Sequence, residues 1–169
     1  MVTPPKFRII VVCTANVCRS PMAETVLRSM AAASGTFGLE VDSAGTRVSR
    51  PGVRPDPRAE AVLRERGYVV RKGRSRALTR GDFDGFDLLL AMDRTNLADM
   101  QAVAAPYRHK LRLWMDFAQK PGSDVPDPYF GNANGFARVL DLCEAGARGL
   151  LEHLRQGAVS MDASLARRR

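Results

Sequence analysis

The sequence predicts an α/β fold, a single-domain doubly wound parallel sheet of about four strands with helices on both faces. Three observations lead to this prediction. Short apolar runs, which suit strands buried on both faces, alternate along the chain with amphipathic helical patterns. The chain has 169 residues, which is the size of one domain, and it shows no internal repeat. In such a sheet, ligands bind at the carboxyl ends of the strands.

The first half of the chain begins with a strand over the β-branched run at residues 9–12. A helix is expected next, with Ser20 as its N-cap, Pro21 as its first helical residue and apolar side chains at helical spacing behind them. Gly35 ends this helix, and residues 39–41 are predicted to form a second short strand.

The second half continues the alternation. Asp56 and Pro57 resemble a cap and a first-turn proline, so a helix is expected to run to about Arg66. The apolar runs at residues 86–92 and 111–114 are predicted to be the third and fourth strands. The last helix is expected to present one apolar face, made of Phe136, Leu140, Cys143, Ala147, Leu150, Leu151 and Leu154.

The composition excludes several classes of protein. Hydrophobic residues make up 45% of the chain and charged residues 26%, which rules out wholesale disorder. No apolar run reaches the roughly 18 residues that a membrane-spanning helix needs. Three cysteines do not make a disulfide scaffold, and the first residues lack the apolar segment of a signal peptide. We therefore expect a cytoplasmic protein with free thiols.

The charge balance favours an anionic partner. Lys and Arg number 26 against 18 Asp and Glu, which gives a net charge of +8. This balance alone does not choose among nucleic acid, a membrane surface and a phosphorylated substrate. Because the chain ends in three arginines after a polar stretch, we expect one domain over residues 1–158 and a polar, basic tail over residues 159–169.

The segment after the first strand is predicted to carry the chemistry. It places Cys13 and Arg19, separated by five residues, between a buried strand and the start of a helix. A helix N-terminus offers unpaired amide donors and a partial positive charge, so a loop that curls into it makes an anion cradle. The planar guanidinium of Arg19 can bind two phosphate oxygens at once. In that cradle Cys13 is expected to sit as a thiolate and to accept a phosphoryl group.

A leaving alkoxide or phenoxide also needs a proton. Asp127 lies between two prolines, on a loop near the carboxyl end of the predicted fourth strand, which is a suitable place for a general acid. Asp124 in the same loop and Asp93 after the third strand are the alternatives. Tyr129 and Phe130 are placed to form a wall for an aromatic ring.

Five segments, in order, resemble the low-molecular-weight protein tyrosine phosphatases. The resemblance covers roughly residues 6 to 156 of the chain. The cysteine–arginine spacing alone would be a weaker signal, because unrelated phosphatases and sulfurtransferases share it. The five segments are residues 13–21, 43–46, 55–59, 86–93 and 127–129.

The resemblance implies roles for single residues. Cys13 would be the nucleophile, Arg19 the phosphate clamp, and Asp127 the acid that protonates the leaving group and then activates water. Cys18 would trap Cys13 as a disulfide after oxidation. Loop-bracing roles fall on Asn16, which would fix the loop backbone, Ser20, which would stabilise the thiolate, and Ser43. The substrate-binding residues would be Thr14, Ala15, Asn16, Val17, Cys18, Ser20, Tyr129 and Phe130.

The resemblance also bears on cofactors and partners. It implies neither a metal nor an organic cofactor. The expected partner is a phosphorylated protein, with a tyrosine kinase as the opposing enzyme, and neither nucleic acid nor a membrane is expected to bind. The sequence does not determine the oligomeric state, for which we expect a monomer.

The chain departs from the family at two places. Members often carry an aromatic residue near the position of Ser49, where it forms one wall of the substrate slot, and no aromatic lies between residues 44 and 55 here. Members also often have a histidine, tied to the loop-bracing serine, about where this chain has Gly73 or Arg74. These departures bear on the preference for phosphotyrosine and on the rigidity of the loop.

Three other functions remain open from the residues. A protein-arginine phosphatase of the same fold would share the loop, although Val17 and Tyr129 favour the tyrosine phosphatase. An arsenate reductase needs a relay of further thiols, and the one cysteine outside the loop is Cys143. A basic module that binds nucleic acid or phosphoproteins would lack any recognised nucleic-acid motif.

The remaining cysteines and histidines have simpler interpretations. A zinc site made of Cys13, Cys18, Cys143 and a histidine is permitted by the spacing but not favoured, because Cys143 lies on an apolar helix face. We expect Cys143 to lie in the core. His109 and His153 are expected at the surface.

Overall fold

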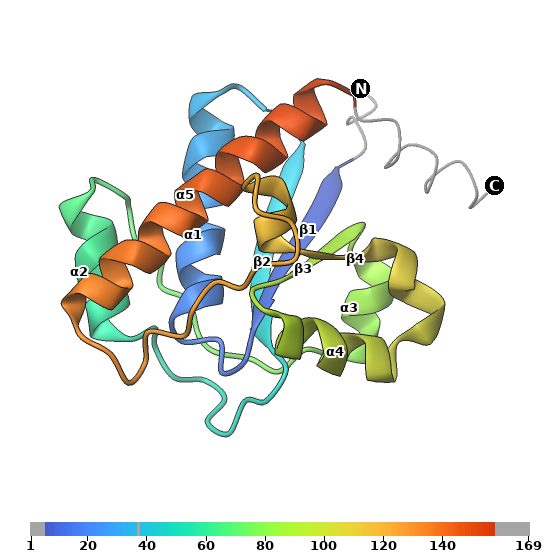
Figure 1. Ribbon diagram of the computed structural model, residues 1–169, viewed down its shortest axis with the longest axis horizontal. Coiled ribbons are helices and arrows are strands. Elements are labelled where there is room, and N and C mark those ends of the chain that lie inside the picture. Colours follow the sequence, from blue (N-terminus) through green and yellow to red (C-terminus); the bar gives the residue numbers. More distant parts are fainter. Residues whose placement is uncertain (1–5, 37, 158–169) are drawn as a thin grey trace.

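A parallel sheet forms the centre of the molecule. The computed structural model describes residues 6–36 and 38–157. Its four strands run in the order β2-β1-β3-β4, and every neighbouring pair is parallel (Figure 1). This architecture confirms the predicted α/β fold. The strands are β1 (Phe7–Cys13), β2 (Leu39–Gly45), β3 (Leu88–Ala91) and β4 (Leu111–Leu113).

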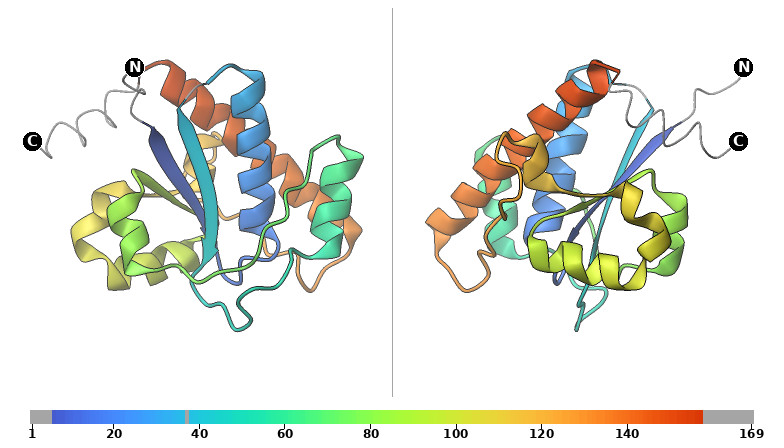
Figure 2. Two further views of the ribbon diagram at one scale, coloured as in Figure 1. Left: turned by 180° about the vertical axis from the view of Figure 1, so that it is seen from behind. Right: turned by 45° about the vertical axis from the view of Figure 1, so that its right-hand side comes forward.

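Helices cover both faces of the sheet, as the two views of Figure 2 show. One face is covered by α1 (Arg19–Ala33), α2 (Pro57–Glu65) and α5 (Ala133–Arg155). The other is covered by α3 (Arg80–Gly85) and α4 (Arg94–Val103). Two 3-10 turns flank β4, namely η1 (Ala105–Lys110) and η2 (Trp114–Phe117).

The apolar run of β1 is buried on both sides. Ile9 and Val11 pack among the side chains of α1 and α5, whereas Ile10 and Val12 pack on the opposite face. All four are fully buried. Successive side chains of a strand point to opposite faces, so a strand between two helical layers must be apolar at every position. Burying each such side chain contributes about 1.5–3 kcal/mol.

The start of α1 differs from the prediction. Ser20 is not the N-cap: the helix begins at Arg19, Cys18 occupies the cap position, and no side chain caps the first turn. The hydroxyl of Ser20 instead lies 3.0 Å from the sulfur of Cys13. The helix therefore opens directly out of the loop, with its first amide groups not closed by a side-chain cap. The cap at Asp56 is confirmed, since its carboxylate accepts a hydrogen bond from the backbone N–H of Arg58 at 2.9 Å.

The other boundaries shift by a few residues, and two helices were not predicted. The second strand runs on to Gly45, because it pairs with β1 along its whole length. The third and fourth strands are shorter than expected. The helix α3 begins at a cap formed by Thr79 and Asp82. The helix α4 is capped by Asp93, whose carboxylate accepts a hydrogen bond from the backbone N–H of Asn96. The first is too short to produce a clear apolar period, and the second is only weakly amphipathic.

The last helix packs closely on the segment after β4. The predicted apolar face is buried except at Leu154, which is half-buried, and Cys143 is fully enclosed in it. At Gly146 an added Cβ would lie 2.1 Å from Nε1 of Trp114, so only glycine lets the indole approach. That nitrogen donates a hydrogen bond to the carbonyl of Leu142 at 3.1 Å.

No helix among residues 6–36 and 38–157 is long and apolar enough to cross a membrane. The basic tail predicted for residues 159–169 lies outside the described residues.

Candidate active site

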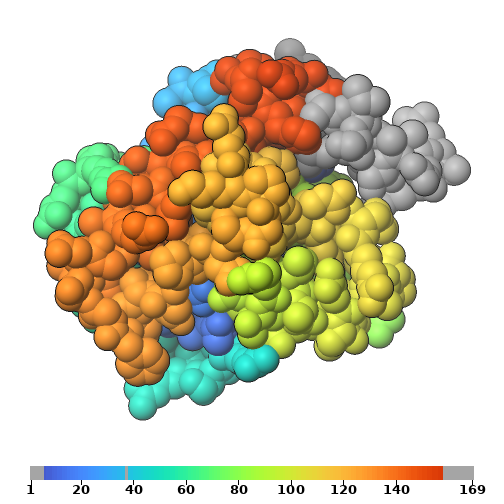
Figure 3. Space-filling model, in the orientation of Figure 1, coloured from blue at the N-terminus to red at the C-terminus, as the bar shows by residue number. Residues whose placement is uncertain are grey.

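A pocket of about 460 Å³ opens at the carboxyl end of β1, where the sequence predicted a site. Its floor is the loop from Cys13 to Arg19, and its walls are residues 49–57 and 127–130. In Figure 3 the early part of the chain (blue) reaches the surface between the orange segment before α5 and the teal segment after β2. The loop, the two walls and the helix N-terminus thus meet at one edge of the sheet.

Unpaired backbone donors surround the cysteine. Among the described residues, no protein oxygen accepts a hydrogen bond from the backbone N–H groups of residues 15–18. These groups precede the uncapped N-terminus of α1, whose dipole adds partial positive charge. Cys13, at the start of this loop, is buried. A loop of this kind suits an anion with several acceptor oxygens.

Asn16 ties the loop to its surroundings. Its φ of 58° lies in the left-handed region, which asparagine tolerates better than other non-glycine residues. The buried side-chain amide donates to Ser20 Oγ at 2.9 Å and to Ser43 Oγ at 3.0 Å. Its oxygen accepts from the backbone N–H of Arg76 at 3.0 Å. The three residues expected to brace the loop are therefore in direct contact.

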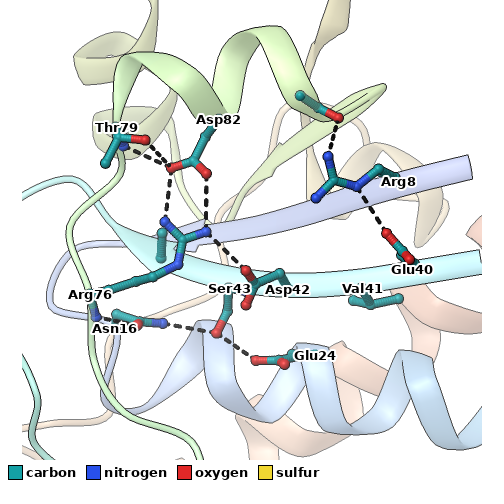
Figure 4. A network of polar contacts seen from close by, with 12 residues as sticks. Arg8, Asn16, Glu24, Glu40, Val41, Asp42, Ser43, Arg76, Thr79 and Asp82 are labelled. Atoms are coloured by element: carbon teal, nitrogen blue, oxygen red, sulfur yellow. Dashed lines mark hydrogen bonds and ion pairs between the residues drawn. The ribbon is translucent and has the colours of Figure 1, made fainter.

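Glu24 is the neighbour of Ser43 in this chain, which lacks the histidine that family members often tie to this serine. The hydroxyl of Ser43 donates to Glu24 Oε2 at 2.6 Å, as Figure 4 shows. The other carboxylate oxygen lies 2.8 Å from Nη1 of Arg28. Burial raises the pKa of Glu24 to about 7, although the hydrogen bond from Ser43 acts to lower it. Sequence reasoning missed Glu24, although it lies four residues after Ser20 and so on the same helix face.

A second support comes from Arg76. Its guanidinium lies between Asp42 and Asp82, at 2.9 Å from each (Figure 4). Asp82 also accepts the backbone N–H of Thr79 at 2.8 Å. Burial alone would raise the pKa of Asp82, but the hydrogen bonds from Arg76 and Thr79 outweigh it and lower that pKa. Through its own backbone N–H, Arg76 connects this ion-paired cluster to Asn16.

Arg19 is held in one orientation by contacts on both of its terminal nitrogens. Nη1 lies 2.5 Å from Asp93 Oδ2 and donates to the carbonyl of Val125 at 3.1 Å. Nη2 donates to Thr14 Oγ1 at 3.2 Å and lies 3.5 Å from Asp127 Oδ2. Burial works to lower the pKa of Arg19, but the hydrogen bond to Asp93 raises it, so the guanidinium stays charged.

The three candidate acids have different surroundings. Asp93 is engaged by Arg19 and by the N-terminus of α4. Asp124 accepts hydrogen bonds from the backbone and side chain of Arg94. Asp127 lines the pocket with its side chain 49% exposed, and its second oxygen accepts the Tyr129 N–H at 3.1 Å. Of these three, Asp127 is the carboxylate that the pocket leaves most open.

The two walls of the pocket differ in character. On one side the rings of Tyr129 and Phe130 meet edge to face at 4.9 Å, and Phe130 is 95% exposed. On the other side, Ser49, Arg50 and Arg54 line the pocket where the family often has an aromatic. The slot therefore has an aromatic wall and a basic wall.

The remaining cysteines and histidines lie as follows. Burial, with a further contribution from Asp56, raises the pKa of Cys18 to about 12, so it is a thiol at neutral pH. No group of three or more potential metal ligands occurs in the part of the chain that the structure describes, and Cys143 lies in the core. His109 is exposed as predicted, whereas His153 is half-buried against the ring of Phe117, with ring centroids 5.4 Å apart.

Fold and pocket together define an α/β protein of the class whose sites lie at a strand-to-helix loop, at the carboxyl end of the sheet. Comparison with known proteins makes the class specific. The family model for low molecular weight phosphotyrosine protein phosphatases matches residues 8–160. The chain belongs to this family, which is a family of hydrolases.

Individual relatives span nearly the whole chain. A low molecular weight protein-tyrosine-phosphatase of Streptomyces coelicolor is 40% identical over 156 residues, which is 89% of this chain and 94% of the relative. The crystal structure of a low molecular weight phosphotyrosine phosphatase from Vibrio cholerae superposes with a TM-score of 0.84 at 36% identity, covering 89% of this chain and 98% of that one. The arginine phosphatase YwlE from Geobacillus stearothermophilus has a TM-score of 0.82 at 28% identity, covering 90% and 96%.

Proposed function

We propose that this protein hydrolyses phosphotyrosine in proteins by way of a phosphocysteine. The observation that carries the proposal is the set of unpaired N–H groups at residues 15–18, in the loop that joins the buried Cys13 to Arg19 along one pocket. A phosphate dianion would satisfy these donors. The cradle would then place its phosphorus next to a sulfur nucleophile, which is the arrangement that phosphoryl transfer needs.

In this proposal the first step is attack by Cys13. The thiolate sulfur forms a bond to phosphorus while the bond from phosphorus to the tyrosine oxygen breaks. Ser20, 3.0 Å from the sulfur, supports the thiolate with its hydroxyl. Arg19 binds two of the phosphate oxygens, and the amides of residues 15–18 bind the others. These donors are fixed before the substrate arrives, so little reorganisation is needed as charge develops in the transition state.

Asp127 completes the cycle as general acid and base. Protonated, it donates to the leaving phenoxide, and as a carboxylate it takes a proton from the water that cleaves the phosphocysteine. Its exposed position on the pocket wall supports this role, because a leaving group must be able to approach it. Tyr129 and Phe130 would pack against the tyrosine ring of the substrate.

The partners follow from the reaction. A phosphorylated protein is the substrate, and a tyrosine kinase would be the opposing enzyme. The cytoplasmic location, the monomeric state and the division into residues 1–158 and a basic tail at 159–169 remain predictions from the sequence.

A protein-arginine phosphatase is the second candidate, because the arginine phosphatase of Geobacillus shares the fold closely. The test compares kcat/KM on phosphotyrosine, phosphoserine and phosphoarginine peptides of one sequence. We expect phosphotyrosine to be the best substrate, because the slot has an aromatic wall at Tyr129 and Phe130. A higher kcat/KM on phosphoarginine would establish the second candidate in place of the first.

A further inference from the structure

The basic wall of the pocket contains two arginines whose charge the protein leaves largely uncompensated. Arg50 forms no ion pair with any described residue. Arg54 has one long contact, 3.8 Å from Nη2 to Glu60 Oε1, and its side chain is 63% exposed. The other oxygen of Glu60 lies closer to Arg64, at 3.0 Å. The Glu60 carboxylate is thus shared between Arg54 and Arg64, and the guanidinium of Arg54 is mostly exposed to solvent.

The acidic groups of the pocket are already engaged elsewhere. Both oxygens of Asp56 accept hydrogen bonds from the Arg58 side chain, at 3.0 and 2.8 Å. Asp127 faces Arg19. No carboxylate that lines the pocket is therefore free to neutralise Arg50 or Arg54. The wall they form is positive at neutral pH, because guanidinium groups do not lose their proton in proteins.

A buried serine fixes the backbone that presents these arginines. Ser75 is 3% exposed, and its hydroxyl donates to the carbonyl of Arg50 at 2.8 Å and accepts the N–H of Val53 at 3.1 Å. Its backbone N–H donates to the carbonyl of Val53 at 2.8 Å, and its carbonyl accepts the N–H of Gly52 at 2.7 Å. Gly52 makes the turn with a φ of 81°. Four hydrogen bonds thus hold a short basic loop at the mouth of the pocket.

We propose that this loop selects phosphotyrosines flanked by aspartate or glutamate, with Arg50 and Arg54 binding the flanking carboxylates and Ser75 positioning both arginines. This inference rests on the proposed function and specifies its substrate class. While the phosphate occupies the cradle and the ring packs on the aromatic wall, neighbouring residues of the peptide must pass the rim, where the basic loop lies. A pre-ordered loop loses little conformational entropy when it binds, so exposed arginines there can still contribute to selectivity.

The test measures kcat/KM for three phosphotyrosine peptides that differ only in their flanking residues, which are acidic, neutral or basic. For the wild type we expect the acidic peptide to exceed the neutral one by roughly three- to tenfold, the value of one or two exposed ion pairs. The difference should reside in KM. It should shrink when the salt concentration rises from about 0.05 M to about 0.5 M, because salt screens exposed charges.

Three variants locate the effect. The double variant Arg50→Gln/Arg54→Gln should bring the ratio of acidic to neutral peptide close to one. Ser75→Ala should lower the same ratio with both arginines still present, which a merely destabilised enzyme would not do. Arg108→Gln removes one charge from an exposed arginine outside the pocket and should leave the ratio unchanged.

Three results would overturn the inference, and they are distinguishable. If the wild type hydrolyses the neutral phosphotyrosine peptide but shows equal kcat/KM for all three, the proposed function stands and the substrate class is wrong. If the ratio falls equally in Arg108→Gln, it reflects net charge and not this loop. Failure to release phosphate from any of the peptides would instead refute the phosphatase proposal and this inference with it.

Discussion

The guanidinium of Arg19 and the carboxylate of Asp93 meet at 2.5 Å, and the same carboxylate caps the N-terminus of α4. One oxygen of Asp93 thus holds the arginine while the other accepts the Asn96 N–H at 2.7 Å. The position of Arg19 under the pocket is thereby connected to the backbone of β3 and α4. A bidentate contact with phosphate needs the plane of the Arg19 guanidinium to be fixed, so this connection supports phosphate binding.

Asp93→Asn should lower kcat/KM by about tenfold or more on every substrate, because small misplacements of a positioning group are costly. Asparagine keeps the cap but loses the ion pair. Steady-state kinetics on an aryl phosphate and on a phosphotyrosine peptide would measure the effect. Asp99→Asn, which breaks the exposed Arg47 pair, is the matched control and should change kcat/KM little. Equal losses in both variants would remove the special role given to Asp93.

Asp127→Asn should make kcat depend steeply on the leaving group. A tyrosine leaving group has a pKa of about 10 and departs poorly as an anion, whereas a nitrophenolate leaves without help. General acid catalysis contributes about 10²- to 10⁴-fold, so the loss should be large on phosphotyrosine and much smaller on nitrophenyl phosphate. Asp124→Asn is the control in the same loop. Equal losses on both substrates in Asp127→Asn would place the acid elsewhere.

Hydrogen peroxide should inactivate the enzyme reversibly. Oxidation of Cys13 to a sulfenic acid, followed by attack of Cys18, forms a disulfide and releases water. Because the pKa of Cys18 is about 12, its thiolate is scarce at neutral pH, and the rate of disulfide formation should rise with pH. Dithiothreitol should restore activity to the wild type but not to Cys18→Ser, which oxidises further. Equal recovery of the two proteins would exclude a protective role for Cys18.

Asp82→Asn should destabilise the fold, by about 1–3 kcal/mol at neutral pH, because it leaves a half-buried guanidinium short of a partner. The pKa of Asp82 is lowered from 3.8 in the folded state. The contribution of the Asp82 carboxylate to the free energy of unfolding is therefore fully present above its pKa in the unfolded state. It is lost as the pH falls through its pKa in the folded state.

Urea unfolding of both proteins between about pH 7 and pH 3 checks this linkage. The difference in unfolding free energy between wild type and Asp82→Asn should narrow toward the acid end. Asp141→Asn, which breaks a largely exposed pair with Arg66, should cost less than about 1 kcal/mol. A difference that stays constant with pH would show that the charge of Asp82 is not what stabilises the fold.

The sequence predicted the fold well where the signals are local. Three largely apolar runs and a short segment at residues 39–41 predicted the strands, and the cap at Asp56 was found at the right residue because capping depends on adjacent positions. Ser20 was misassigned because the cap preference of serine could not be distinguished from its contact with Cys13. The helices α3 and α4 were missed because each is short and only partly apolar.

The site was partly predictable. Cys13, Arg19 and Asp127 do line one pocket, as the spacing of the first two and the positions of Cys13 and Asp127 near strand ends suggested. The supports behind them were not found, since Arg76 lies 60 residues from Asn16 and Asp82 lies 40 residues from Asp42 along the chain. Such contacts depend on how the sheet brings loops together, and no periodic pattern in the sequence reports them.

The most direct test of the whole account is the turnover of an aryl phosphate by Cys13→Ser, beside Cys143→Ser as the matched control. A neutral hydroxyl is a far poorer nucleophile than a thiolate, so Cys13→Ser should fold normally and retain less than about 1% of the wild-type kcat. Cys143→Ser changes a thiol in the core, away from the pocket, and should retain most of its kcat. Turnover by Cys13→Ser at a rate close to the wild type would contradict the phosphocysteine mechanism.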